Sequence, residues 1–183
     1  MDSLSNLEGE APALYIDLEG NNLSRSGTLS LITILVVPRG TVHLVDVTNL
    51  QQQAFDTTGS SGHSLRGILE AVDIIKVFFD IRNDSDALYS LYGVGVQGIW
   101  DLQLFELASR SFSKRCVNGL AKCIENDTRL DYAQRRRWRE VKDRGRRLFD
   151  PARGGTYAVF DRRPLSAEVE VLRTRCPPHA TPL

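Results

Sequence analysis

Hydrophobic and polar residues alternate along the first part of the chain. The segment at residues 13–19 (ALYIDLE) alternates strictly, which predicts a strand. The segment at residues 28–37 (TLSLITILVV) is apolar on both faces, as expected of a central strand. A turn at residues 38–40 leads into residues 41–47 (TVHLVDV), the expected hairpin partner. Because only short turns separate these three strands, we predict an antiparallel meander.

After residue 64 the pattern changes to alternating helices and strands. Ser64 is expected to cap the first of these helices. Helices are expected over residues 65–71, over residues 84–92 and from residue 101 onward, and strands over residues 74–79 and within residues 93–100. An apolar stripe on the last helix is expected from Leu102, Phe105, Leu107 and Ala108. Such alternation favours parallel strands with helices on both faces of a mixed α/β sheet, which is the RNase H-like topology in outline.

The length of the chain, 183 residues, is that of one ordinary domain with a sizeable core. Residues 1–12 are small, polar and acidic, and we expect them to form a loose leader. The domain is expected over residues 13–176, mostly helical beyond Phe112. Residues 177–183 are expected to be an irregular tail, because Pro177 and Pro178 end any helix.

The start of the chain has neither the basic nor the apolar segment of a secretory signal, and no apolar run is long enough to span a bilayer. Cys116, Cys123 and Cys176 match neither a disulfide framework nor the paired spacing of a zinc site. We therefore expect a cytoplasmic or nuclear protein that is not secreted and has no membrane partner. The formal net charge of zero does not decide for or against a polyanionic partner.

Two acids of the first strand are the first candidates for chemistry. Side chains alternate along a strand, so Asp17 and Glu19 point to one face and the neighbouring leucines and isoleucine to the other. Adjacent carboxylates are costly unless a cation lies between them. Phosphodiester hydrolysis by two metal ions uses such carboxylates, and Mg²⁺ and Mn²⁺ both suit oxygen ligands. The alternative is an exposed strand edge with two ordinary acids.

Asp84 follows the strand at residues 74–79 and opens a helix. A carboxylate there would face the carboxyl end of the strand, where the sites of α/β proteins gather, and could be a third metal ligand. It could equally be a helix N-cap, as could its neighbours Ser85 and Asp86. Asp101 has the same two interpretations, and capping is the one we favour for it.

The segment from residue 129 to residue 147 is strongly basic, with nine basic residues against three acidic ones. A basic segment beside an acidic site would hold a phosphate backbone, and Tyr132 and Trp138 could offer stacking faces. Equally, it could be a solvated helix with core contacts from Trp138, Val141 and Leu148. The candidate nucleic-acid-binding residues are Arg135, Arg136, Arg137, Arg139 and Lys142.

Two longer motifs resemble a known family. The stretch ALYIDLEGNNLSRSGTLSLITI resembles the first motif of the DEDD (DnaQ-like) 3′-5′ exonucleases, in their RNase D-like branch. The stretch KVFFDIRNDSDALYSLYGVGVQGIWDLQLFELASR resembles the second. The similarity is especially close to small fungal 3′-5′ exonuclease-domain proteins and runs from about residue 13 to residue 170. It implies an RNase H-like fold, a two-metal site for Mg²⁺ or Mn²⁺, and single-stranded RNA or DNA as the partner.

Carried over by position, the resemblance makes Asp17, Glu19 and Asp84 catalytic metal ligands, with Asp101 in a supporting place. The family's third motif follows R-P-L-S-x-E with a tyrosine and, four residues later, an aspartate. Here these positions hold Leu172 and Cys176, which can neither order a water nor bind a hard ion well. Two functions therefore remain open: an impaired 3′-5′ exonuclease, or an inactive pseudo-nuclease that acts as a nucleic-acid-binding or protein-interaction module.

Overall fold

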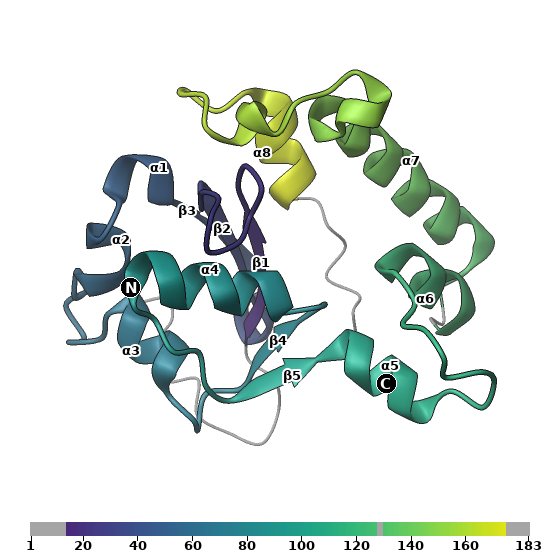
Figure 1. Cartoon of the computed structure of the whole chain (residues 1–183), viewed down its shortest axis with the longest axis horizontal. Coiled ribbons are helices and arrows are strands. Elements are labelled where there is room, and N and C mark those ends of the chain that lie inside the picture. Colours follow the sequence, from purple (N-terminus) through teal and green to yellow (C-terminus); the bar gives the residue numbers. More distant parts are fainter. Residues whose placement is uncertain (1–13, 128–129, 175–183) are drawn as a thin grey trace.

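The computed structural model describes residues 14–127 and 130–174. They form a five-stranded mixed sheet with the order β3-β2-β1-β4-β5, and helices cover it (Figure 1). The strands are β1 (Leu14–Glu19), β2 (Leu31–Val36), β3 (Thr41–Asp46), β4 (Lys76–Phe78) and β5 (Ile99–Asp101). The longer helices are α3 (Leu65–Glu70), α4 (Arg82–Tyr92), α5 (Leu102–Ser109), α6 (Leu120–Asp127), α7 (Tyr132–Phe149) and α8 (Ala167–Thr174). Shorter ones are α1 (Val47–Leu50), α2 (Gln53–Asp56), η2 (Val37–Arg39), η3 (Pro151–Arg153) and η4 (Tyr157–Phe160).

The predicted meander is confirmed. β1 pairs antiparallel with β2, and β2 pairs antiparallel with β3, in a register that places Asp17 opposite Thr33 and Glu19 opposite Leu31. β2 begins three residues later than expected, at Leu31. The reason lies at Ser30, whose carbonyl oxygen accepts from the backbone N–H groups of Val47 and Thr48 at the start of α1.

The predicted change to parallel pairing is also confirmed, since β1 pairs with β4 and β4 with β5 in parallel. Ser64 caps α3 by accepting from the N–H of Gly67. α4 begins at Arg82, two residues earlier than the sequence indicated. The two short helices α1 and α2 were not predicted, because four-residue helices carry almost no periodicity.

One face of the sheet forms the main core. On β1, Leu14, Ile16 and Leu18 are buried and pack with alternate residues of β2. The helices that follow the meander supply the other side of this core, for example Phe55 of α2 and Leu88 of α4. The acidic residues of β1 therefore lie on the opposite face, because alternate side chains of a strand point to opposite faces.

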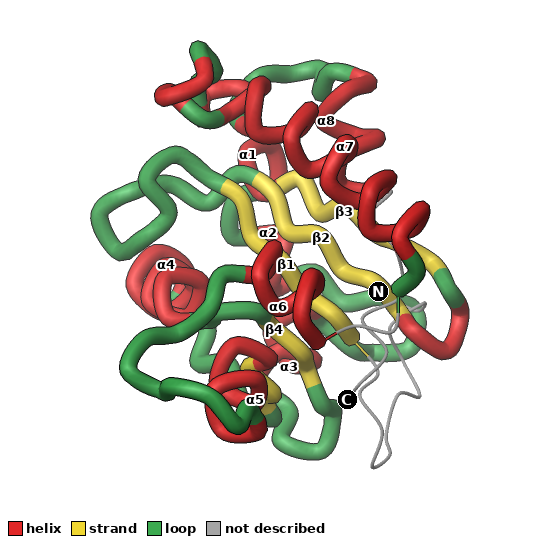
Figure 2. Tube along the Cα trace, turned by 90° about the vertical axis from the view of Figure 1, so that its right-hand side faces the viewer, coloured by secondary structure: helices red, strands yellow, loops and turns green. Residues whose placement is uncertain are grey.

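That opposite face is covered by the C-terminal part of the chain. Leu31 of β2 packs with Phe160 of η4 and Val169 of α8 in a second, smaller core. Figure 2 shows α7 and α8 beside β2 and β3, on the side of the sheet away from α4. Helices thus lie on both faces, as predicted.

Polar contacts fix the C-terminal part to the sheet. The Arg163 guanidinium lies 2.5 Å from the Asp46 carboxylate at the end of β3 and also donates to the carbonyl oxygens of Phe160 and Ser30. The Ser30 hydroxyl donates to the Asp161 carboxylate. These contacts hold the segment between η4 and α8 next to the start of β2.

The prediction of an apolar stripe on α5 is wrong. Phe105 is 44% exposed, whereas the buried residues of the helix are Gln103 and Glu106. Glu106 accepts from the amide of Asn118 and pairs with Arg110, so a polar network in the following loop replaces apolar packing. Hydrogen bonds to Asn118 and within the Glu106–Arg110 pair meet part of the demand of these buried polar groups, and the helix can therefore turn its apolar side outward.

The predicted leader at residues 1–12 and tail at residues 177–183 lie outside the described residues. Leu172 belongs to α8, and Cys176 lies outside the described residues. Within the part of the chain that the structure describes, no helix has the length and apolar character needed to cross a bilayer.

Candidate functional site

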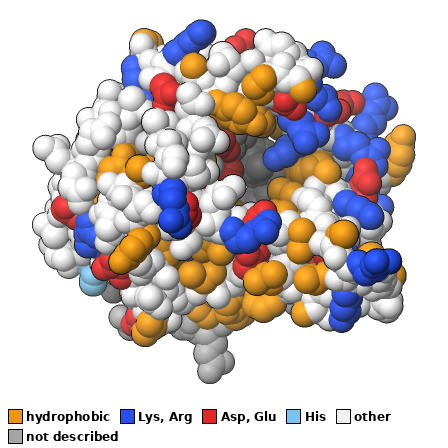
Figure 3. All heavy atoms as spheres, in the orientation of Figure 1, with side chains coloured by type: hydrophobic (Ala, Val, Ile, Leu, Met, Phe, Trp, Pro, Cys, Tyr) orange, Lys and Arg blue, Asp and Glu red, His pale blue; other side chains and the backbone are white. Residues whose placement is uncertain are grey.

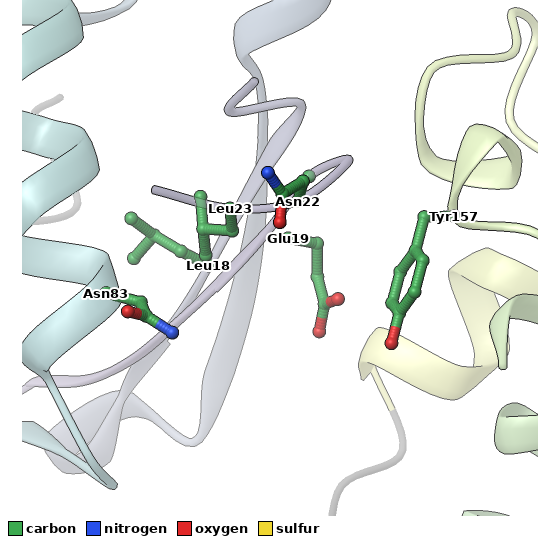
Figure 4. Close-up of a pocket in the computed structure, with 7 residues that line it drawn as sticks. Leu18, Glu19, Asn22, Leu23, Asn83 and Tyr157 are labelled. Atoms are coloured by element: carbon green, nitrogen blue, oxygen red, sulfur yellow. The ribbon is translucent and has the colours of Figure 1, made fainter. Parts of the chain in front are cut away.

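A pocket of about 280 Å³ opens where β1 ends. Glu19 from the end of β1, Asn22 and Leu23 from the following loop, Asn83 from α4 and Tyr157 from η4 line it (Figure 4). Arg25 fixes this loop to α4 by donating from its backbone N–H and its guanidinium to the Asp86 carboxylate. The pocket therefore joins the first acidic motif, the start of α4 and the C-terminal part of the chain.

Tyr157 is a pocket residue that the sequence did not point to. Its ring packs against Phe149 of α7 at a centroid distance of 5.7 Å, and it remains 38% exposed. Figure 4 shows the ring on the opposite side of the pocket from Asn83, with its hydroxyl end level with the Glu19 carboxylate. No motif or periodicity links Tyr157 to Glu19, so only the tertiary fold brings them to one pocket.

Asp84 lies in the first turn of α4 and is half-buried. The N-cap residue of α4 is Ile81, so the interpretation of Asp84 as the cap is wrong. Burial, and then the negative charges of Asp17, Asp80 and Asp101, raise the pKa of Asp84 to about 8. Asp17 on β1 is thus close enough to Asp84 for the two carboxyl groups to interact electrostatically, as in sites that carboxylates share.

Asp101 has the capping role that we favoured. Its carboxylate accepts from the backbone N–H of Gln103, 2.9 Å away, at the start of α5. It also accepts from the N–H groups of Asp80 at 3.0 Å and Ile81 at 3.2 Å. Asp101 therefore holds the turn that leads into α4, and this turn positions Asp84.

The turn before α4 contains a further acid. Asp80 has a φ of +63°, a left-handed conformation that is uncommon for a residue with a side chain. Its carboxylate pairs with Arg82 at 2.6 Å, and hydrogen bonding to this arginine lowers the pKa of Asp80. Asp80 is therefore ionised next to Asp84, which adds to the negative charge there.

The acids offer oxygen ligands of the kind that Mg²⁺ and Mn²⁺ prefer. Burial raises the pKa of Asp84 most, and the neighbouring carboxylates add a smaller part that a divalent cation would offset. Among the described residues, however, no three Asp, Glu, His or Cys side chains lie close enough together to hold an ion. The donor chemistry fits a divalent cation, but in the described part of the chain these acids do not form a group that could hold one.

The core contact predicted for the basic segment is confirmed at Trp138, whereas its binding of nucleic acid stays a prediction. Trp138 is buried, so it provides a core contact and no free stacking face, whereas Tyr132 is 79% exposed. Arg135 and Lys142 lie on the half-buried side of α7. Arg136, Arg137 and Arg139 are exposed, and Arg136 pairs with Glu140 while Arg139 pairs with Glu125. Part of the positive charge is thus offset within the chain.

The surface in Figure 3 is hollowed near the middle of the face that it shows. Acidic side chains lie on the wall of this hollow, and Lys and Arg side chains gather on its right-hand rim, toward α7. An acidic centre with a basic rim suits a strand whose phosphates are held beside a cation-binding site.

Comparison with protein families matches residues 1–138 to a 3′-5′ exonuclease domain. A relative of known role, the piRNA biogenesis protein EXD1 of Mus musculus, is 29% identical over 116 residues, which are 61% of this chain and 19% of EXD1. The chain therefore spans about a fifth of the length of this relative.

Two solved structures of RNase D from Trypanosoma brucei share the fold. The complex with GMP has a TM-score of 0.70 at 23% identity. The match covers 93% of this chain and 48% of the RNase D chain. The complex with RNA U12 has a TM-score of 0.65 at 23% identity. That match covers 94% of this chain and 55% of the RNase D chain. These likenesses confirm the predicted RNase H-like exonuclease fold.

Proposed function

Because the chain belongs to the 3′-5′ exonuclease family, we propose that it removes nucleotides from the 3′ end of single-stranded RNA or DNA. One observation carries the proposal: Asp17 and Asp84, from the two sequence motifs, interact beside a pocket that has room for a nucleotide. RNA is the better-supported substrate, since RNase D of Trypanosoma brucei binds RNA on the same fold.

In this proposal Asp17, Glu19 and Asp84 hold Mg²⁺ or Mn²⁺. Such ions supply a water of lowered pKa and stabilise charge on the leaving oxygen. Asp101 keeps the turn before α4 in place, and the Asp80–Arg82 pair borders the same turn. Leu23 and Tyr157 would contact the terminal base, and the amides of Asn22 and Asn83 would contact its polar edge or the sugar.

The proposed activity is impaired, because Leu172 and Cys176 stand where the family has tyrosine and aspartate. The same two residues favour the second candidate, a pseudo-nuclease that binds single-stranded nucleic acid without cutting it. The absence of a three-acid group among the described residues agrees with either function.

Cleavage of end-labelled single strands in Mn²⁺ tests the proposal. With 5′-labelled RNA we expect a ladder of stepwise shortened products, and with 3′-labelled RNA early release of the labelled nucleotide. Asp17→Ala and Glu19→Ala should abolish the ladder and the release of the 3′ label. Asp73 is an exposed acid in another loop, and Asp73→Ala should leave both signals unchanged. Binding of intact strands without cleavage would establish the pseudo-nuclease instead.

A further inference from the structure

A second pocket, of about 220 Å³, lies between the end of α5 and the first turn of α6. It shares no lining residue with the pocket at Glu19. Its lining includes three cations, Arg110, Arg115 and Lys122, together with the ring of Phe112. Residues 107–124 contain four basic residues and no acidic one. Figure 3 shows Lys and Arg side chains among hydrophobic ones at the lower right, over this loop.

Arg110 is fixed in the wall of this pocket. Its side chain is 3% exposed, with one nitrogen 3.4 Å from Glu106 and another donating to the carbonyl oxygen of Cys116. Its guanidinium carbon lies 5.1 Å from the centre of the Phe112 ring. Among the described residues, the buried Nε–H of Arg110 has no hydrogen-bond acceptor. A buried donor without an acceptor is unfavourable, and an anionic oxygen that reached it would offset this cost.

The other two cations are available to a ligand. Arg115 and Lys122 are exposed, and neither takes part in an ion pair within the described residues. Glu106 offsets the charge of Arg110 only, so the pocket keeps a positive charge from the two exposed side chains. A fixed guanidinium flanked by two mobile cations suits a tetrahedral oxyanion such as phosphate.

The ring of Phe112 narrows the choice of ligand. It is 48% exposed, with Arg110 against it, so part of its surface can receive a stacked base. Phosphate-binding cations beside an exposed aromatic ring are the combination by which proteins hold single-stranded nucleic acids. We propose that this pocket binds a backbone phosphate of a single strand, as a second contact outside the Glu19 pocket; this rests on the proposed function.

Strand binding by the full chain in Ca²⁺, measured by fluorescence anisotropy against salt concentration, tests the inference. Arg115→Ala combined with Lys122→Ala should weaken binding of single-stranded RNA about tenfold and lower the salt slope by about 0.7, the value for one lost phosphate contact. Arg39→Ala, an exposed arginine in the β2–β3 turn, should leave both unchanged.

The outcomes separate the two proposals. An RNA affinity and salt slope unchanged in the folded double variant would overturn the second contact and leave the exonuclease proposal standing. A wild-type chain that neither binds nor cuts strands would overturn both. If inorganic phosphate binds the wild type but not the double variant, while strand affinity is unchanged, the pocket takes a free anion and its assignment to nucleic acid is wrong.

Discussion

Burial and the negative charge of Asp17 on β1 raise the pKa of Asp84 on α4, which joins the two acidic motifs of the sequence in one electrostatic site. Burial is the larger cause of this shift, and Asp80 and Asp101 add to it. Around neutral pH the Asp84 carboxyl group therefore keeps its proton, although a metal ligand must lose it. This competition has measurable consequences.

The affinity for Mn²⁺ should rise with pH and level off above about 8, the pKa of Asp84. Below that pH each unit should cost up to about tenfold in affinity, because one proton must leave for the ion to bind. Isothermal titration calorimetry in buffers of different ionisation enthalpy measures both the affinity and the proton release. An affinity that does not change between pH 6 and about 8 would show that Asp84 is no ligand.

The metal-free protein should lose stability as pH rises from about 4 to about 8. The folded pKa of Asp84 lies above its ordinary value of 3.8, so the folded state keeps a proton that the unfolded state has lost. Asp84→Asn should therefore raise the free energy of unfolding by about 1–3 kcal/mol at pH above 8, measured by thermal denaturation in EDTA. Asp86→Asn, which removes a carboxylate paired with Arg25, should give no such gain.

Tyr157→Ala should weaken binding of a mononucleotide at least about fivefold, because a stacked base contributes about 1–3 kcal/mol. Equilibrium dialysis in Ca²⁺ measures this without turnover. The matched control is Tyr89→Ala, which removes a tyrosine that is 68% exposed on α4 and outside the pocket lining. An equal loss of mononucleotide affinity in both variants would show that Tyr157 does not stack on the base.

Arg163→Ala should lower the free energy of unfolding by about 2–3 kcal/mol, because it leaves Asp46 without its charged partner. The neighbouring Arg162→Ala, at an exposed position, should change it by less than about 0.5 kcal/mol. Hydrogen bonding to Arg163 lowers the pKa of Asp46, so this stabilisation is present above the ordinary pKa and is lost as pH falls through the folded one. Denaturant titrations at neutral and acidic pH should therefore converge for Arg163→Ala and wild type.

Restoring the third motif should increase exonuclease activity. Leu172→Tyr with Cys176→Asp supplies a hydroxyl and a carboxylate at the positions that the family resemblance identifies. We expect a rise in the cleavage rate of at least about tenfold, typical of a positioned proton-transfer or water-orienting group. The isosteric control, Leu172→Phe with Cys176→Asn, should not show this rise in the cleavage rate. A rate that is unchanged in both variants would mean that these positions do not reach the site.

The sequence by itself determined the antiparallel meander and the later alternation of helices with parallel strands. Alternation on β1, the two-sided apolar run of β2 and the later α/β alternation each reflect which faces must be buried, and burial is a property of the local pattern. The same alternation placed Asp17 and Glu19 on one face of β1. Family motifs added Asp84, at a position where capping was an equally good local explanation.

The tertiary structure alone decided what surrounds these acids. α5 buries Gln103 and Glu106, both of which hydrogen-bond to Asn118 of a later loop, and no local pattern encodes that partner. Tyr157 reaches the Glu19 pocket because Arg163 fixes the C-terminal segment to β3. The pKa of Asp84 likewise depends on burial and on charges from other elements. Such contacts join residues far apart in the chain, and sequence periodicity describes only neighbours.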